Sequence, residues 1–188
     1  MAREASRLLD EYLVVSAQAG DRRAFAQLVA RWHKRLIVHA WRLTGDPDSA
    51  RDAAQTGWSE IVRGLARLND ARAFPAWAYR IVSRVCAKQA RRERGRRLLA
   101  EAIGAEPAPE PIGPDAGVEH DRLRAAIRAL PPDQRAAIAL YHFEELSVAE
   151  VAVALDVSAG TVKTRLMHAR RKLRAALEGE ETCGISTR

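Results

Sequence analysis

The stretch that decides the fold is DVSAGTVKTRLMHARRKLRAAL, residues 156–177. Its apolar residues recur every three or four positions, as they do on the packed side of an amphipathic helix: Val162, Leu166, Ala169, Leu173 and Leu177. Its bases between residues 163 and 174 are interrupted by no acid: Lys163, Arg165, Arg170, Arg171, Lys172 and Arg174. A surface helix with solvated charges and a helix that enters DNA both have this pattern, so the preceding residues decide between them.

The preceding segment, LSVAEVAVAL at residues 146–155, has the signature of a capped helix. Ser147 is placed to cap its first turn and Glu150 to reach back, which is a capping box. A tight turn through Asp156 and Val157 follows, and Ser158 is placed to cap the next helix. Two capped helices joined by a three-residue turn predict a helix-turn-helix.

The second helix of this pair would present its free side to DNA. Lys and Arg reach phosphates and guanine edges, Thr reads base edges, and a helix start points backbone N–H groups at phosphate. The predicted DNA-binding residues are Ser158, Thr161, Lys163, Thr164, Arg165, His168, Arg171 and Lys172. A small helical bundle with a solvated basic face is the alternative, but capping, turn length and charge together favour DNA.

The residues before this pair complete a small domain and a linker. Leu123, Ile127 and Leu130 predict a short helix, and Pro131–Pro132 start another that runs to about Phe143. Residues 98–118 hold four of the eight prolines and four acids but no base, which predicts an extended acidic linker. The expected second domain is therefore a four-helix module over residues 119–180, with a tail at residues 181–188.

Residues 1–97 predict a first domain that is also all-helical. A short helix is expected at about residues 11–19, and a long amphipathic helix at residues 21–44, with Asp21 as its N-cap and Gly45 as its stop. Asp46 and Pro47 start the next helix, whose Gly57 and Gly64 indicate close packing or a bend. After an NDARAF loop, a third long helix begins near residue 74. The fold class is all-α, with two helical domains.

The end of the third helix holds a second basic cluster. Residues 80–97 carry eight bases against Glu93: Arg80, Arg84, Lys88, Arg91, Arg92, Arg94, Arg96 and Arg97. The chain as a whole has a formal net charge of +7. A solvated basic tail would look similar, but the density of charge favours contact with nucleic acid.

Several classes of protein are disfavoured by what the residues lack. Cys86 and Cys183 stand in no zinc-binding pattern, and the histidines form no ligand spacing, so we expect no metal and no cofactor. No nucleophile arrangement or phosphate-binding loop indicates an enzyme. No apolar segment approaches the ~20 residues of a membrane span. We expect a cytoplasmic protein without membrane insertion.

The chain as a whole resembles the bacterial sigma factors of the extracytoplasmic-function (ECF) group, over about residues 12–178. The segments that carry the resemblance stand in the family's order: GDRRAFAQLVARWHKRL, DPDSARDAAQTGW, AFPAWAYRI and LPPDQRAAIALYHFEELSVAEVAVALDVSAGTVKTRLMHARRKL. The opening LPPDQR and the core GTVKTRL of the last segment are more distinctive than a generic helix-turn-helix.

The resemblance implies a role for each domain. The second domain would read the minus-35 promoter element as duplex. The first would bind core RNA polymerase through Asp48, Asp52, Gln55, Thr56 and Trp58, although Trp58 also lies on an apolar stripe. It would open the minus-10 element through Asn69, Asp70, Arg72, Phe74, Trp77, Arg80, Arg84, Lys88, Arg91 and Arg92, with core packing of Trp77 equally open. An anti-sigma factor or other regulatory protein is an implied partner.

Two departures from the family pattern stand out. Arg51 and Thr56 occupy positions where relatives have acids that face the polymerase, which makes Thr56 a candidate phosphorylation site. Arg84 and Lys88 stand where relatives commonly have Asn and Asp, which predicts an altered preference at the minus-10 element. The alternative to a sigma factor is a stand-alone helix-turn-helix regulator, which would bind duplex tightly without polymerase.

Overall fold

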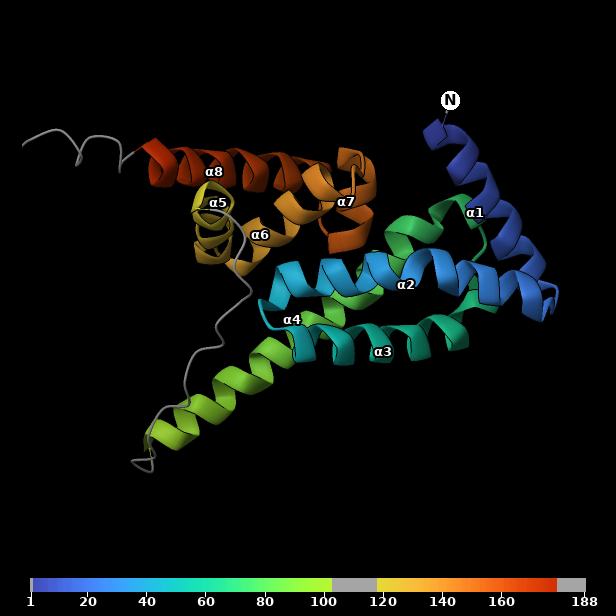
Figure 1. The fold of residues 1–188 in the computed structure, drawn as a ribbon, viewed down its shortest axis with the longest axis horizontal. Coiled ribbons are helices and arrows are strands. Elements are labelled where there is room, and N and C mark those ends of the chain that lie inside the picture. Colours follow the sequence, from blue (N-terminus) through green and yellow to red (C-terminus); the bar gives the residue numbers. More distant parts are fainter. Residues whose placement is uncertain (1, 103–117, 179–188) are drawn as a thin grey trace, which may run out of the picture. The chain divides into compact units, whose positions relative to one another are not determined.

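The computed structural model describes residues 2–102 and 118–178, and every regular element in these ranges is helical. The chain divides into two compact units, residues 1–109 and 110–188. Figure 1 shows α1–α4 in the first unit and α5–α8 in the second. This confirms the predicted all-α class. Most of the predicted linker (residues 103–117) and the predicted tail lie outside the described residues.

The first unit is built around α2 (Arg22–Thr44), which packs against α1 (Ala2–Gln18), α3 (Pro47–Gly64) and α4 (Phe74–Ala102). Short turns η1 (Leu65–Arg67) and η2 (Ala71–Ala73) connect α3 to α4. The predicted apolar stripes supply the buried core, which includes Leu28, Trp32, Leu36, Ala54, Ile61, Ala78 and Val85. Burial of these faces is what holds short helices together in water.

The predicted ends of α2 and α3 are confirmed. The Asp21 carboxylate accepts from the Arg23 and Ala24 backbone N–H groups at 2.7 and 3.2 Å. Gly45 ends α2 with φ +76°, a left-handed conformation that costs glycine little. Asp46 accepts from the Ser49 N–H at 2.7 Å and so caps α3.

Both glycines of α3 mark close packing between helices. A Cβ at Gly57 would lie 2.7 Å from the Val82 side chain, and one at Gly64 would lie 2.8 Å from the Trp77 ring. Of the two predicted roles, close approach and bend, the structure supports close approach. Glycine destabilises the helix at these two positions, but its lack of a side chain allows α3 and α4 to pack closely.

The first helix is longer than predicted: α1 begins at Ala2 rather than near residue 11. The sequence pattern missed its first half because polar side chains face inward there. Arg31 donates from Nε to Asp10 at 2.8 Å and from Nη2 to the Ser6 hydroxyl at 2.9 Å. Asp10 is buried by this ion pair, so the apolar period is broken on the packed side.

The boundary predicted at residue 98 is also corrected, because α4 continues to Ala102. Leu98 and Leu99 are exposed on this last part of the helix. Acid and proline content marked the linker, but the first of those prolines is Pro107, so nothing in residues 98–102 prevents the helix from continuing.

The second unit consists of α5 (Val118–Ala129), α6 (Pro132–Ile138), the π-helical turn η3 (Ala139–Phe143), α7 (Val148–Leu155) and α8 (Ala159–Glu178). Helices α5, α6 and α7 all pack against α8. The buried residues are aliphatic and include Leu140, Leu146, Val151, Val162, Leu166 and Ala169. Leu123 of α5, predicted to face inward, is instead exposed.

The capped pair predicted at α7 and α8 is confirmed. The Glu150 N–H donates to the Ser147 hydroxyl at 3.2 Å, while Ser147 N–H donates to the Glu150 carboxylate at 2.7 Å. Asp156 turns the chain in the left-handed region, at φ 57° and ψ 48°. The Thr161 N–H then donates to the Ser158 hydroxyl at 3.1 Å, which fixes the start of α8.

Candidate nucleic-acid interface

The exposed side of α8 is defined by what lies opposite to it. Val162, Leu166 and Ala169 are buried against the other helices of the unit, so the residues on the far side of α8 face solvent. Exposed there are six of the eight predicted DNA-binding residues: Ser158, Thr161, Lys163, Thr164, Arg171 and Lys172. His168 is half-buried.

Hydroxyl groups at the start of α8 are engaged with one another and with the backbone. The Ser158 and Thr161 hydroxyls lie 2.9 Å apart, and the Thr164 hydroxyl donates to the Gly160 carbonyl at 3.1 Å. Either Ser158 or Thr161 is the donor in the first of these bonds, so one of their two hydroxyl protons and the Thr164 proton are used within the helix. The other proton and the oxygen lone pairs remain available for hydrogen bonds. The hydroxyls at the start of α8 can therefore meet either donor or acceptor groups of nucleobases in the major groove.

The predicted bases of α8 differ in what they touch. Arg165 donates to Asp133 of α6 at 2.8 Å and keeps a side-chain exposure of only 22%. Arg165 therefore ties α8 to α6 in this structure rather than standing in the exposed row. Arg171 donates to Nδ1 of His168 at 3.4 Å, which orients both side chains on one face.

In the first unit, the NDARAF loop, which is predicted to help open the minus-10 element, is a tight turn capped by Asp70. Asp70 caps η2 by accepting from the Arg72 backbone N–H at 3.0 Å and from its Nε at 3.1 Å. The side-chain hydrogen bond from Arg72 lowers the pKa of Asp70. Asn69, Asp70 and Arg72 are exposed, and so remain available to a ligand. The pairing pre-orders the turn, so the sequence prediction of an irregular loop is refined.

The predicted DNA contact of the aromatic residues next to this turn is corrected. Phe74 is fully buried and packs edge-to-face on Trp32, with ring centroids 5.2 Å apart. Trp77 is half-buried, 6.1 Å from the Phe74 ring and against Gly64. Phe74 is thus a core residue and not a surface for a base. Of the two roles left open for Trp77, the structure supports packing.

The basic side chains of α4 differ in their surroundings: the first ones are paired or half-buried, and the later ones are exposed. Arg84 donates to Glu60 of α3 at 3.1 Å, whereas Arg80 is half-buried. Lys88, Arg91 and Arg92 are exposed, and all described side chains from residue 91 to residue 99 face solvent. The last part of α4 carries basic side chains on every side of the helix. This distribution favours binding of a polyanion but does not indicate which face contacts it.

The predicted polymerase-binding residues all lie on α3, and all but one of them are exposed. Asp48, Asp52, Gln55 and Thr56 are exposed, and Asp48 forms an ion pair with Arg51 one turn later. Trp58 is instead buried, edge-to-face with Phe25 at a centroid distance of 6.2 Å. Trp58 belongs to the core because it lies on the stripe of Ala54 and Ile61, so its assignment to the polymerase surface is wrong.

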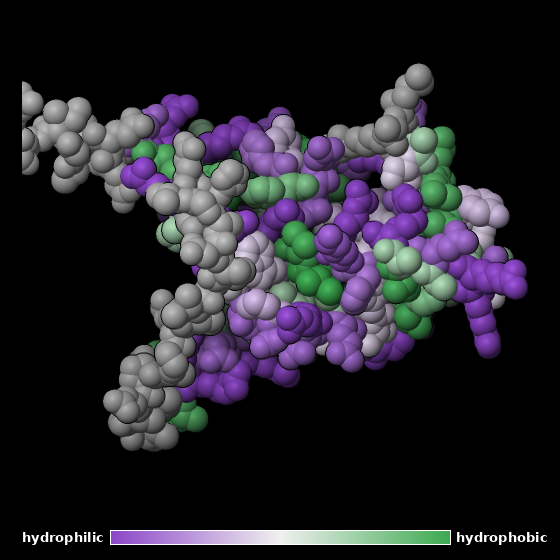
Figure 2. Space-filling view, in the orientation of Figure 1, coloured by the Kyte–Doolittle hydropathy of each residue, from purple (hydrophilic) through white to green (hydrophobic). Residues whose placement is uncertain are grey.

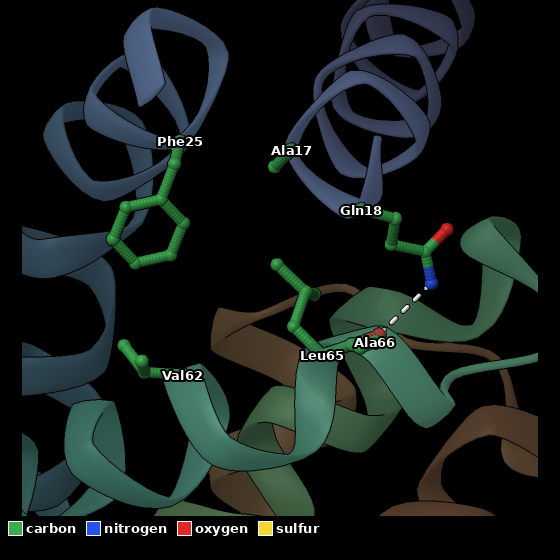
Figure 3. A pocket seen from close by; sticks show the side chains of 6 residues that line it. All are labelled: Ala17, Gln18, Phe25, Val62, Leu65 and Ala66. Atoms are coloured by element: carbon green, nitrogen blue, oxygen red, sulfur yellow. Dashed lines mark hydrogen bonds between the residues drawn. The ribbon is translucent and has the colours of Figure 1, made fainter. Parts of the chain in front are cut away.

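Sequence reasoning missed a hollow at the end of α3. It has a volume of about 200 Å³ and is lined by Ala17, Gln18, Phe25, Val62, Leu65 and Ala66. Figure 3 shows these residues around the hollow, on α1, α2, α3 and η1, with Gln18 Nε2 donating to the Leu65 carbonyl at 2.9 Å. No short-range pattern could reveal it, because it forms where three helices meet.

Apolar side chains also gather along α1. Figure 2 shows green side chains over this helix at the right of the view, within a mostly hydrophilic face. The exposed residues are Leu8, Leu9, Tyr12 and Val15. They lie opposite the buried Leu13 and Val14, so α1 carries apolar residues on two sides.

The thiol and the buried histidine of the first unit are structural. Burial raises the pKa of the Cys86 thiol to about 12, as expected of an inert core cysteine. His39 is fully buried, with Nε2 2.9 Å from the Ser83 hydroxyl. Burial and then the Arg42 charge lower the His39 pKa to about 3, so this ring is neutral at ordinary pH.

The described residues contain neither a metal-binding cluster nor a membrane-spanning helix. Among them, no group of three or more His, Cys, Asp or Glu side chains is placed to hold a metal ion. None of the helices in the described ranges is both long and apolar enough to cross a bilayer.

Comparison with known proteins establishes the family. Models of sigma-70 region 2 and sigma-70 region 4 match residues 28–96 and 120–173. The RNA polymerase sigma-H factor of Pseudomonas aeruginosa is 32% identical over 182 residues, which cover 90% of this chain and 94% of that protein. The ECF RNA polymerase sigma factor SigM of Mycobacterium tuberculosis is 33% identical, covering 95% and 89%. The chain belongs to the ECF sigma factors, which direct RNA polymerase to promoters.

Solved structures agree with the architecture. CnrH, in complex with the cytosolic domain of CnrY, matches with a TM-score of 0.70 and 27% identity, covering 91% of this chain and 98% of CnrH. The sigma factor RpoE of Bartonella quintana, in complex with the anti-sigma factor NepR, also gives 0.70, at 24% identity over 82% of this chain and 96% of RpoE. The second likeness supports the fold.

Proposed function

We propose that the two units divide promoter recognition between them. Residues 119–180 read the minus-35 element as duplex through the exposed side of α8. Residues 1–97 bind core polymerase through α3. They hold the melted minus-10 strand with the η2 turn and the basic side chains of α4. The observation that carries this proposal is the capped α7–α8 pair, whose second helix buries one side and presents a basic row on the other.

The roles assigned to the first unit follow from the residues that stay exposed. Asn69 and Arg72 are exposed at the turn, while Lys88, Arg91 and Arg92 are exposed on the second half of α4. The phosphates of a melted DNA strand would form ion pairs with these Lys and Arg side chains. With Phe74 and Trp58 in the core, we assign strand capture to polar and charged groups and polymerase contact to Asp48, Asp52, Gln55 and Thr56.

Thr56 is a candidate phosphorylation site on the polymerase side of α3. It is exposed, and Asp52 and Glu60 lie one turn before and after it on the same helix. A phosphate would add about −1.5 to −2 charges, which extends the acidic row toward a basic polymerase surface. The idea is tested by transcription in cells. It fails if Thr56→Ala transcribes as well as the wild type, and Thr56→Glu should partly restore function.

Three further assignments accompany this proposal. The chain carries out no reaction of its own and acts by recruiting polymerase. It works in the cytoplasm, where polymerase and promoters are found. An anti-sigma factor regulates it, since CnrH and RpoE were each solved in complex with a partner protein.

Transcription from a random-sequence promoter library with purified core polymerase tests the proposal. Core with the chain should yield transcripts from templates that share two separated elements, and core alone should not. Initiation no better than that of core alone would overturn the proposal. The alternative, a stand-alone helix-turn-helix regulator, would bind duplex tightly and selectively without polymerase, and the family of the chain does not favour it.

A further inference from the structure

One apolar side chain stands in the middle of the predicted DNA-binding side of α8. Met167 is 57% exposed, although it lies on a helix whose buried side is supplied by other residues. Its neighbours at three- and four-residue spacing are Lys163, Thr164, Arg170 and Arg171. An apolar side chain is thus surrounded on the helix surface by three bases and a hydroxyl.

The surrounding charges restrict what this side chain can meet. A purely apolar protein surface placed on Met167 would desolvate Lys163 and Arg171 without pairing them, which is costly. A ligand that fits must offer an apolar group flanked by negative charges. The major groove of DNA does so, because the C5 methyl of thymine projects between two phosphate backbones.

Several other side chains on this face are engaged in contacts within the second unit, whereas Met167 is exposed near its centre. Arg165 is held by Asp133, the Thr164 hydroxyl proton is used within α8, and the Thr161 hydroxyl is hydrogen-bonded to that of Ser158. Arg170 lies over the Tyr141 ring at 5.6 Å, on the flank toward η3. The unbranched, polarisable thioether of methionine adapts to the shape that it contacts.

We propose that Met167 is a specificity-determining residue that reads a thymine methyl in the duplex element bound by α8. The proposal rests on the assignment of α8 to the minus-35 element. Lys163 and Arg171, one turn before and after Met167, hold the flanking phosphates and set its depth in the groove. The element should contain a thymine at which no hydrogen bond is decisive but the methyl group is.

The test removes only that methyl group. Elements are first selected from random duplexes with the chain and core polymerase, and each thymine is then replaced by deoxyuridine. Binding of the wild-type complex should weaken about fourfold at one or two positions, the contribution of one buried methyl. In Met167→Ala this thymine–deoxyuridine difference should vanish, while Met167→Leu should keep it. Val153→Ala, a change at another exposed apolar residue of the unit, is the matched control and should keep it too.

Each other outcome overturns the inference. Equal binding to thymine and deoxyuridine duplexes by the wild type, an element without thymine, or undiminished discrimination by Met167→Ala would each do so. Loss of polymerase binding in Met167→Ala, with discrimination unchanged, would assign this face to an acidic protein partner instead. Selection of no element at all would overturn the proposed function together with the inference, whereas selection without methyl dependence removes the inference alone.

Discussion

The two units stabilise their helices by different means. The core of the first unit contains rings that pack on one another, with Trp32 against both Phe74 and Tyr79 and with His39 against Tyr79. The buried residues described in the second unit are aliphatic, and its helix pair depends on the Ser147–Glu150 box and the Ser158 cap. The rings that fill the core of the first unit are therefore not available at its surface.

The same difference separates the two interfaces. In the second unit, charge and caps predicted the exposed side of α8, and these residues need no burial to act. In the first unit, the resemblance assigned Phe74 and Trp58 to ligands, and the structure places both inside. The comparison teaches that a family role transfers to this chain for polar positions more readily than for aromatic ones.

The largest effect should come from Phe74→Ala, which removes a ring from the centre of the first unit. Loss of a buried phenylalanine costs about 3–5 kcal/mol of unfolding free energy. Urea unfolding followed by tryptophan fluorescence reports on the first unit, because Trp32, Trp41, Trp58 and Trp77 all lie there. Phe74→Leu should be much milder. A stable Phe74→Ala variant that fails only in promoter opening would restore Phe74 to the DNA surface.

The buried His39 should make the first unit sensitive to acid. Its pKa is about 3 in the folded state against an ordinary value of 6.5, so between these values only the unfolded chain binds the proton. Stability is therefore complete above about pH 6.5 and falls as pH decreases toward 3, by up to about 1.4 kcal/mol per pH unit. His39→Gln should flatten this slope in urea titrations, whereas exposed His33→Gln should keep it. An unchanged slope in His39→Gln would refute the assignment.

Arg171→Ala should weaken binding about equally for all promoter sequences, as expected for a phosphate contact, without unfolding the second unit. The slope of log binding constant against log salt should decrease in magnitude by about 0.9, as for one lost phosphate contact. Arg165→Ala is the comparison, since its side chain is paired with Asp133. If Arg165→Ala lowers the salt slope and Arg171→Ala does not, the exposed row on α8 has been assigned wrongly.

The smallest of these effects should follow Ser147→Ala, which removes one half of the capping box. Loss of such a cap costs about 1 kcal/mol. Because the tryptophans lie in the first unit, the change should appear in hydrogen exchange of α7 and leave the fluorescence transition unmoved. Exposed Ser59→Ala within α3 serves as the control. A shift of the fluorescence transition by Ser147→Ala would show that the units are not separately stabilised.

Sequence patterns predicted most elements because local interactions fix them. The caps Asp21, Asp46, Ser147 and Ser158 each bond within four residues of themselves. Apolar spacing likewise predicted most of the buried residues of α2, α3 and α8, although Leu177 at the end of α8 is exposed. Local pattern failed where distant residues decide, as at the start of α1, whose Asp10 is buried by Arg31.

The candidate sites divide along the same line. The exposed basic residues of α8 and α4 could be predicted from the density of charge in the sequence. The burial of Phe74 and Trp58, the Arg165–Asp133 pair and the hollow beside Phe25 each depend on contacts between helices far apart in sequence. Met167 was overlooked because an apolar residue among bases matches no motif, and only its exposure in the folded unit reveals it.

Permanganate footprinting of a selected promoter tests the central claim, that one unit reads duplex while the other holds a melted strand. With core polymerase and the chain, thymines of the downstream element should become reactive while the upstream element stays paired and protected. Arg171→Ala should reduce upstream protection, and Arg72→Ala should reduce downstream reactivity at saturating complex. Protection of duplex by the chain alone, with no reactive thymine when polymerase is added, would contradict the account.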